Sequence, residues 1–138
     1  MATKFFSQEW CDGAMDAANA SEPMYKGFKK ASTFTNKMAF GVLGRDDLVS
    51  HLEWKEGRIV SWTSGRQYDQ DELWLDIKAD METWKDLAEG RAEAGKMLVM
   101  GKVKFEKGPM SAAIENAVAL HHFLQSWGRA ADEIDYDV

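Results

Sequence analysis

The sequence predicts an α+β domain in which helices cover one face of a β-sheet. The chain has 138 residues, of which 45% are hydrophobic, and this is the size of one folded domain. Its apolar residues change from helical to strand spacing after Thr33 and return to helical spacing after Asp80. Runs of strands flanked by helices are typical of two-layer α+β proteins. We expect one domain over 1–138, with an ordered core over about 7–128 and a frayed acidic tail over 132–138.

The N-terminal segment is predicted to be helical. Ser7 is a suitable N-cap for a helix that runs to about Ala20. Residues at helical spacing give this helix one apolar face: Trp10, Cys11, Ala14, Met15 and Ala18. Pro23 favours a short second helix through Lys30, because proline is well tolerated in a first helical turn.

Four strands are expected next. Apolar residues alternate with polar or small ones near 38–42, 48–55, 58–63 and 73–78, as half-buried strands require. The dipeptide at 56–57, Glu-Gly, suits a two-residue hairpin loop between the second and third strands. The four strands follow one another as in a meander, so we expect a mainly antiparallel sheet.

The C-terminal half is predicted to return to helices, with one further strand. A helix over 80–90 has an Asp N-cap and a terminal Gly. Residues 92–100 suit a short helix, although 97–100 also reads as a strand. Strict alternation predicts a fifth strand over 102–107, and a long helix is expected over about 109–128. One broad face of that helix is apolar: Met110, Ala113, Ile114, Ala117, Leu120, Leu124 and Trp127.

Charge and composition exclude several classes of protein. The net charge is −6, and residues 66–89 carry eight acidic residues against three basic ones, which counts against nucleic-acid binding. The single cysteine, Cys11, supplies neither an intramolecular disulfide nor a paired metal knuckle. We find no signal-peptide core at the start and no apolar run near the ~20 residues of a membrane span. A cytoplasmic protein is expected.

No catalytic constellation is recognisable. His121 and His122 are adjacent, so on a helix they diverge by about 100° and do not share a metal. His122 is expected in solvent, and His121 is either a partly buried structural residue or a polar tether for a ligand headgroup. His51 alternates outward on its strand and is expected at the surface. Cys11 is expected to be a packed, inert thiol. We therefore expect no enzyme activity, no cofactor and no metal.

The aromatic and methionine content is larger than a minimal core needs. Six Trp, seven Phe and eight Met occur in this chain. Each one alone is best read as core, but as a set they favour a domain that keeps interior space for an apolar ligand. The candidate lining residues come from the apolar faces of the predicted elements: Phe40, Leu52, Trp54, Trp62, Trp84, Met97, Met100, Phe105, Met110, Ile114, Val118 and Leu124, with His121 as a polar anchor.

Two stretches carry a family resemblance. Residues 84–90 read Trp-Lys-Asp-Leu-Ala-Glu-Gly, and 97–105 read Met-Leu-Val-Met-Gly-Lys-Val-Lys-Phe. They resemble the sterol carrier protein type-2 (SCP-2) family, in which an aromatic-Lys-acidic-Leu helix ends in Gly. A second Gly follows eleven residues later and opens a Lys-apolar-Lys-apolar strand, and Gly90 and Gly101 keep this interval. The likeness extends over about 7–128.

The chain departs from the family pattern at three places. It has Glu-Ala-Gly at 93–95 where the family usually has a proline, its glycine after the last strand comes one residue late at Gly108, and it lacks the peroxisomal ending of animal members. These differences concern the lining of the binding site rather than the fold.

The resemblance implies both a fold and a function. It implies a five-stranded sheet covered on one face by helices, with a hydrophobic tunnel between the layers. Family members bind fatty acyl chains, acyl-CoA, sterols or other lipids without catalytic residues of their own. The leading hypothesis is therefore a carrier for a hydrophobic small molecule. One alternative is an accessory domain that presents an apolar substrate to a partner enzyme. Another is an interaction module whose apolar face is buried by a partner, which includes a second copy in a homodimer. A third is an enzyme that uses Cys11 or His121.

Overall fold

A five-stranded sheet with the strand order β4-β3-β2-β5-β6 forms one layer of the protein. The computed structural model describes residues 2–138, and Met1 of the predicted domain lies outside them. The strands are β2 Asn36–Val42, β3 Arg45–Lys55, β4 Arg58–Ser64, β5 Leu75–Ala79 and β6 Val103–Lys107. Neighbouring strands are antiparallel except for the central pair β2 and β5, which is parallel. The prediction of a mainly antiparallel five-stranded sheet is confirmed.

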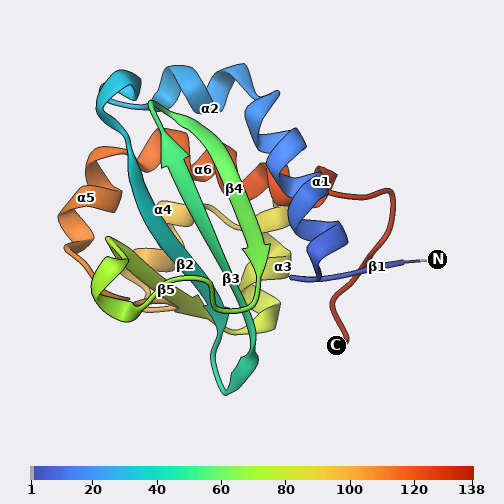
Figure 1. Cartoon of the computed structure of the whole chain (residues 1–138). Coiled ribbons are helices and arrows are strands. Elements are labelled where there is room, and N and C mark those ends of the chain that lie inside the picture. The colour runs from blue at the N-terminus through green and yellow to red at the C-terminus, as the bar shows by residue number, and fades with distance from the viewer. Residues whose placement is uncertain (1) are drawn as a thin grey trace.

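The helices form a second layer against one face of this sheet (Figure 1). Their bounds are α1 Gln8–Asn19, α2 Glu22–Gly27, α3 Met81–Ala88, α4 Ala94–Val99, α5 Met110–Glu115 and α6 Ala117–Ser126. Within residues 2–138, none of them has the length and apolarity of a membrane span. The predicted caps are present: the side chain of Ser7 accepts from the Trp10 amide, and that of Asp80 accepts from the Thr83 amide at 2.8 Å. Residues 94–99 are helical rather than extended, which settles the ambiguity of that segment.

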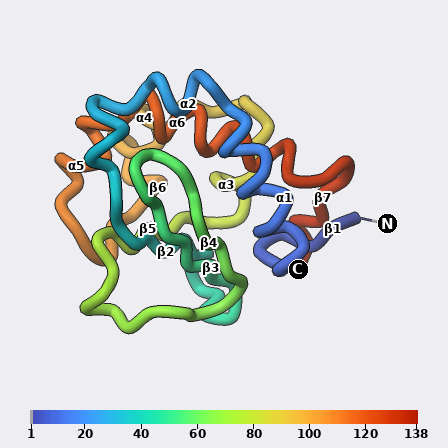
Figure 2. Tube along the Cα trace, turned by 45° about the horizontal axis from the view of Figure 1, so that its top comes forward, coloured from blue at the N-terminus to red at the C-terminus, as the bar shows by residue number. Residues whose placement is uncertain are grey.

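The fourth strand does not continue the meander that the sequence predicts. After β4, at one edge, the chain crosses the sheet and enters β5 on the far side of β2, with Met38 opposite Leu75. The connection passes over the face that is turned away from the helices (Figure 2). A parallel neighbour needs a crossover of this kind, whereas a meander needs a hairpin. The polar residues of this connection look like an ordinary loop in the sequence, so the crossing is visible only in the structure.

This crossover buries His51, which the sequence placed at the surface. The residue is 1% exposed, and its Nδ1 accepts from the backbone amides of Gln67 and Tyr68, both at 3.0 Å. The ring of Tyr68 stacks on it at 5.7 Å between centroids. The expectation of a surface histidine was wrong because alternation along β3 shows which face a side chain takes, but not what covers that face.

The predicted long helix over 109–128 is broken into two. At Asn116 the backbone leaves the helical region, with φ −111° and ψ 27°, between α5 and α6. The Asn116 side chain accepts from the Lys29 amide and donates to the carbonyl of Ala112. Gly27 approaches the first turn of α6 so closely that a Cβ there would lie 2.7 Å from the Ala119 nitrogen. The break therefore allows α5 and α6 to pack against α2.

The C-terminal segment, which the sequence predicts to be frayed, pairs with the N-terminal strand. Strand β7, Ile134–Asp135, runs parallel to β1, Thr3–Lys4. Tyr136 packs on Phe5 with 5.2 Å between ring centroids. The acidic composition suggested a solvated tail, but its apolar residues reach the aromatic core.

Aromatic side chains fill most of the space between the layers. Trp10, Trp54, Trp84 and Trp127 are fully buried, and Trp127 contacts both Trp10 and Trp84 at 5.2 and 5.1 Å between ring centroids. Such edge and tilted pairs add to the stability that burial of apolar area provides. Around Trp10, Trp54 and Trp127, under α1 and the C-terminal end of α6, the interior is sealed.

Helix α1 also seals the sheet edge at β4. The side-chain amide of Asn19 bonds both the N–H and the carbonyl of Ile59 at 2.9 Å. Gln8 bonds the carbonyl of Trp62 and the N–H of Ser64 in the same way. These two amide pairs occupy backbone groups that an edge strand otherwise leaves open.

Candidate ligand-binding site

A cavity of about 340 Å³ lies between the β2, β5 and β6 half of the sheet and helices α4, α5 and α6. Its floor is a row of three side chains that are neighbours in the sheet register, Phe40, Ile77 and Phe105. Met38 and Val103 extend this floor. The row forms because alternate residues of each strand point to the helix side.

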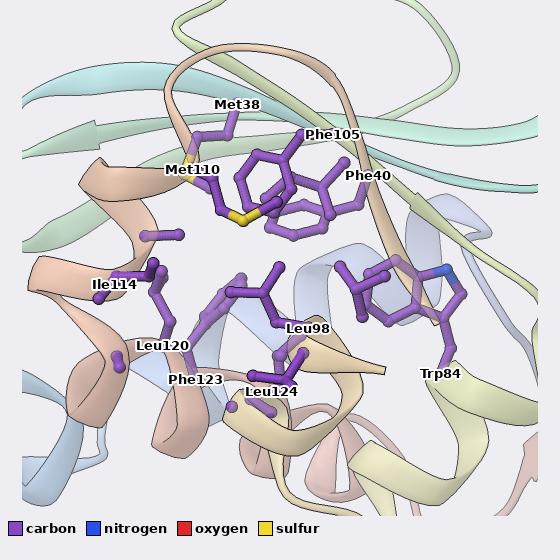
Figure 3. A pocket seen from close by; sticks show the side chains of 17 residues that line it. Met38, Phe40, Trp84, Leu98, Phe105, Met110, Ile114, Leu120, Phe123 and Leu124 are labelled. Carbon is purple, nitrogen blue, oxygen red and sulfur yellow. The ribbon is translucent and has the colours of Figure 1, made fainter. Parts of the chain in front are cut away.

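The helices supply the walls and roof of the cavity. Figure 3 shows Leu98 of α4 facing the phenylalanines of the floor, with Trp84 on one side and Met110 and Ile114 on the other. The helical lining residues are Trp84, Ala94, Gly95, Leu98, Val99, Met110, Ala113, Ile114, Ala117, Leu120, Phe123 and Leu124. The indole N–H of Trp84 donates to the carbonyl of Gly41 at 2.8 Å, so its one polar atom is used.

The lining carries no ionisable side chain and no free polar group. All 17 lining residues are apolar side chains or glycine, apart from the bonded Trp84 N–H. Apolar cavities of this kind stay dry or bind apolar molecules, because water needs two or more polar partners. The site has no nucleophile, acid or base.

The cavity opens to solvent between α4 and α5. Three residues that line it are also largely exposed, namely Val99 at 88%, Met110 at 45% and Ile114 at 58%. Helix α4 contributes no fully buried residue. The wall formed by α4 is therefore the least tightly packed part of the site.

A polar recess adjoins the cavity on the other side of α4. Both hollows are lined by Gly95 and Ala117, and the recess continues along Lys96, His121 and Gln125. The Nδ1 atom of His121 is buried and finds no hydrogen-bond partner within residues 2–138.

The predicted site residues fall into four places. Six line the apolar cavity: Phe40, Trp84, Phe105, Met110, Ile114 and Leu124. Three line the recess: Met97, Val118 and His121. Met100 ends α4 and is exposed, outside both hollows.

The remaining three predicted residues lie in the sealed core. Leu52, Trp54 and Trp62 are buried and do not line the cavity. They belong to β3 and β4, whereas the cavity lies over β2, β5 and β6. The predicted faces are correct, but a sheet face can meet a packed helix at one end and an open space at the other.

Several lining residues were missed by the sequence prediction. Leu120, Ala113 and Ala117 share the apolar face that the sequence assigns to the C-terminal helix, so the pattern carried this signal. No sequence signal pointed to Phe123 or Leu98. The break before α6 and the position of α4 bring them to the cavity.

Cys11 is not a reactive group. It is fully buried, and burial raises the pKa of its thiol to about 12. The thiolate is the nucleophilic form, so such a thiol is inert in the folded state. Within residues 2–138, we find no cluster of three or more His, Cys, Asp or Glu side chains suited to a metal ion.

The comparisons with known proteins concern the fold. No family model and no curated protein matches the sequence. A crystal structure of sterol carrier protein 2 matches with a TM-score of 0.75 and 24% identity, over 91% of this chain and 98% of that chain. This chain has the SCP-2 fold. A conserved hypothetical protein from Thermus thermophilus has a TM-score of 0.67 and 22% identity, over 92% of both chains. A UbiJ-SCP2 ubiquinone synthesis protein has a TM-score of 0.55 and 12% identity, over 83% of this chain and 90% of that one.

The motif that resembles the SCP-2 family frames α4 in this structure. Gly90 follows α3 with φ +77°, and Gly101 follows α4 with φ +74°. Glycine adopts this left-handed region without strain, which explains the residue type at both positions. The eleven-residue interval between them therefore contains the helix that covers the cavity.

Proposed function

We propose that this protein is a non-catalytic carrier that holds an apolar ligand, such as an acyl chain or a sterol-like molecule, in the cavity under α4. The observation that carries the proposal is the wholly apolar lining of a 340 Å³ space. The SCP-2 fold supports it, because a structural neighbour is named as a sterol carrier protein. The lining offers no group for acid, base or nucleophilic chemistry.

The expected affinity follows from the burial of apolar area. A chain of about twelve methylenes gains on the order of 10 kcal/mol at ~0.8 kcal/mol each. Association and ordering offset a large part of this gain, so a dissociation constant in the micromolar range is expected. His121 is the proposed polar anchor, because it lines the recess that adjoins the cavity and its buried Nδ1 has no hydrogen-bond partner within residues 2–138.

The proposal is tested by titration of the protein with a long-chain fatty acid and a sterol, followed by tryptophan emission, since Trp84 lines the cavity. Ala113→Phe places a ring in the cavity and should abolish the emission change without loss of stability. Ala112→Phe is the matched control, because Ala112 is the preceding residue on α5 and does not line the cavity. Equal titrations of both variants and the unmodified protein would contradict the proposal.

A second candidate is an accessory domain that presents its ligand to a partner enzyme. It is favoured by the neighbour named as a ubiquinone synthesis protein and by the opening between α4 and α5. Extraction of freshly purified protein and mass spectrometry of the extract would identify a co-purifying molecule. A ligand that reaches the cavity only in the presence of a second protein would favour this candidate.

A further inference from the structure

The side of the cavity farthest from its mouth is a wall of aromatic rings. Phe40, Trp84 and Phe123 line the cavity and are buried. The ring of Phe40 lies 5.9 Å from that of Trp84 and 5.6 Å from that of Phe123, centroid to centroid. We call these three residues the inner wall. Figure 3 shows Trp84 on the opposite side of the space from Ile114, which is exposed at the mouth.

Phe123 separates the cavity from the sealed core. It lines the cavity, and its ring also contacts Trp54 and Trp62, at 5.1 and 5.5 Å between centroids. Neither of these two tryptophans lines the cavity. Removal of the Phe123 ring would therefore extend the cavity toward them.

The inner wall is held from behind. Trp127 does not line the cavity, but its ring lies 5.3 Å from Phe40, 5.1 Å from Trp84 and 5.6 Å from Phe123. Close-packed interiors of this kind yield little space to an added group. Helix α4, at the mouth, has no fully buried residue. A chain that is longer than the cavity therefore projects from the mouth rather than into the core.

The volume of the cavity limits the size of the ligand. An apolar cavity of ~150 Å³ holds one benzene molecule. At the same ratio of volume to carbon atoms, the 340 Å³ found here holds on the order of 14 carbons. The fused rings and side chain of a sterol contain about twice as many carbons, which exceeds this space.

We propose that Phe123 determines the length of the ligand, and that the ligand is a single acyl chain of about 14 carbons rather than a sterol. This inference rests on the proposed carrier function and names the class of ligand. Each methylene that enters the cavity strengthens binding about fourfold, until the chain reaches the inner wall. Further methylenes stay in solvent at the mouth and add little affinity.

The test is isothermal titration calorimetry with saturated fatty acids of about 8 to about 20 carbons, each below its aggregation concentration. For the unmodified protein, affinity should rise with chain length and level off near about 14 carbons. Cholesterol should displace the bound acid only weakly. In Phe123→Ala a ring-sized space is added, so the levelling should move to chains up to about six carbons longer.

A second variant tests the same idea by filling space, which avoids the loss of stability that a new void causes. Ala113 is buried and lines the cavity. The added carbons of Ala113→Leu should move the levelling to chains about three carbons shorter. Ala112→Leu is its control, because Ala112 does not line the cavity.

Phe34→Ala is the matched control for Phe123→Ala. Phe34 is buried and packs on Trp54 with the same 5.1 Å between ring centroids, but it does not line the cavity. Phe34→Ala should lose stability as Phe123→Ala does and should keep the chain length of the unmodified protein. An equal shift in both variants would overturn the role of Phe123.

The carrier function and the length assignment fail in different ways. If no fatty acid of any length binds, the carrier function is wrong and the length assignment falls with it. If fatty acids bind but affinity rises through the longest chain without levelling, the length assignment alone is wrong. The same holds if Ala113→Leu levels off where the unmodified protein does, or if cholesterol binds as tightly as the best fatty acid.

Discussion

Replacement of Leu52 and of Leu98 by alanine should separate the sealed core from the ligand cavity. The two residues have the same chemistry but different surroundings. Leu52 is fully buried on β3, opposite Met38 and Trp62 in the sheet register. Leu98 is half-buried on α4 and faces the cavity.

The expected loss of stability follows from those surroundings. Leu→Ala removes about three methylene-sized groups, or ~2.4 kcal/mol at ~0.8 kcal/mol each when the site is fully buried. At Leu52 a new void of on the order of 50 Å³ adds ~1 kcal/mol at ~24 cal/mol per Å³, for a total of about 3 to 4 kcal/mol. At Leu98 the space on one side already exists and the residue is partly exposed, so a loss of about 1 kcal/mol is expected.

Urea unfolding followed by circular dichroism measures these losses, and a fatty acid titration measures binding. A native stability of about 5 to 15 kcal/mol keeps Leu52→Ala folded during the titration. Its affinity should equal that of the unmodified protein, whereas Leu98→Ala should bind up to about tenfold more weakly. Equal destabilisation by both changes, or weaker binding by Leu52→Ala alone, would refute the division into sealed core and open cavity.

Three further predictions concern regions away from the cavity. Gln8→Ala and Asn19→Ala should each lower the free energy of unfolding by about 1 to 2 kcal/mol in urea titrations, because each leaves two groups of β4 unpaired; a loss below the error of the measurement would show that water replaces them. Burial lowers the pKa of His51, so the unfolded chain takes up the proton first and stability should fall as the pH drops below about 6.5. His51→Gln should flatten that part of the stability profile, and an unchanged slope would assign it to other groups. Cys11, whose buried thiol has a pKa of about 12, should react with a disulfide reagent only at the rate of unfolding; fast labelling of the native protein would contradict its burial.

Local signals in the sequence predicted the elements well. Ser7 and Asp80 cap helices where the pattern places them, because a cap needs only a side chain and an amide three residues away. The alternation in β2, β3 and β6 identifies the face that meets the helices, because successive strand residues point to opposite sides. Gly90 and Gly101, with the Lys-apolar-Lys-apolar strand after them, led to the SCP-2 resemblance.

Contacts between distant parts of the chain decided the rest. The parallel pairing of β2 with β5 brings the 65–74 connection across the sheet and buries His51, although nothing near residue 51 signals a cover. The break at Asn116 depends on contacts with Gly27 and Lys29, which lie nearly ninety residues earlier in the chain. The C-terminal strand depends on Thr3–Lys4 at the other end of the chain.

The sequence alone determined that this chain is an α+β domain with an apolar interior and helices on one face of its sheet, because periodicity, caps and turns are set by neighbouring residues. Only the tertiary structure decided where that interior is filled and where it is hollow. Trp54 and Phe105 have similar patterns, yet helices pack tightly over the first and leave space over the second. That difference depends on how closely two layers approach at each point of the sheet, and no local pattern of residues encodes the distance.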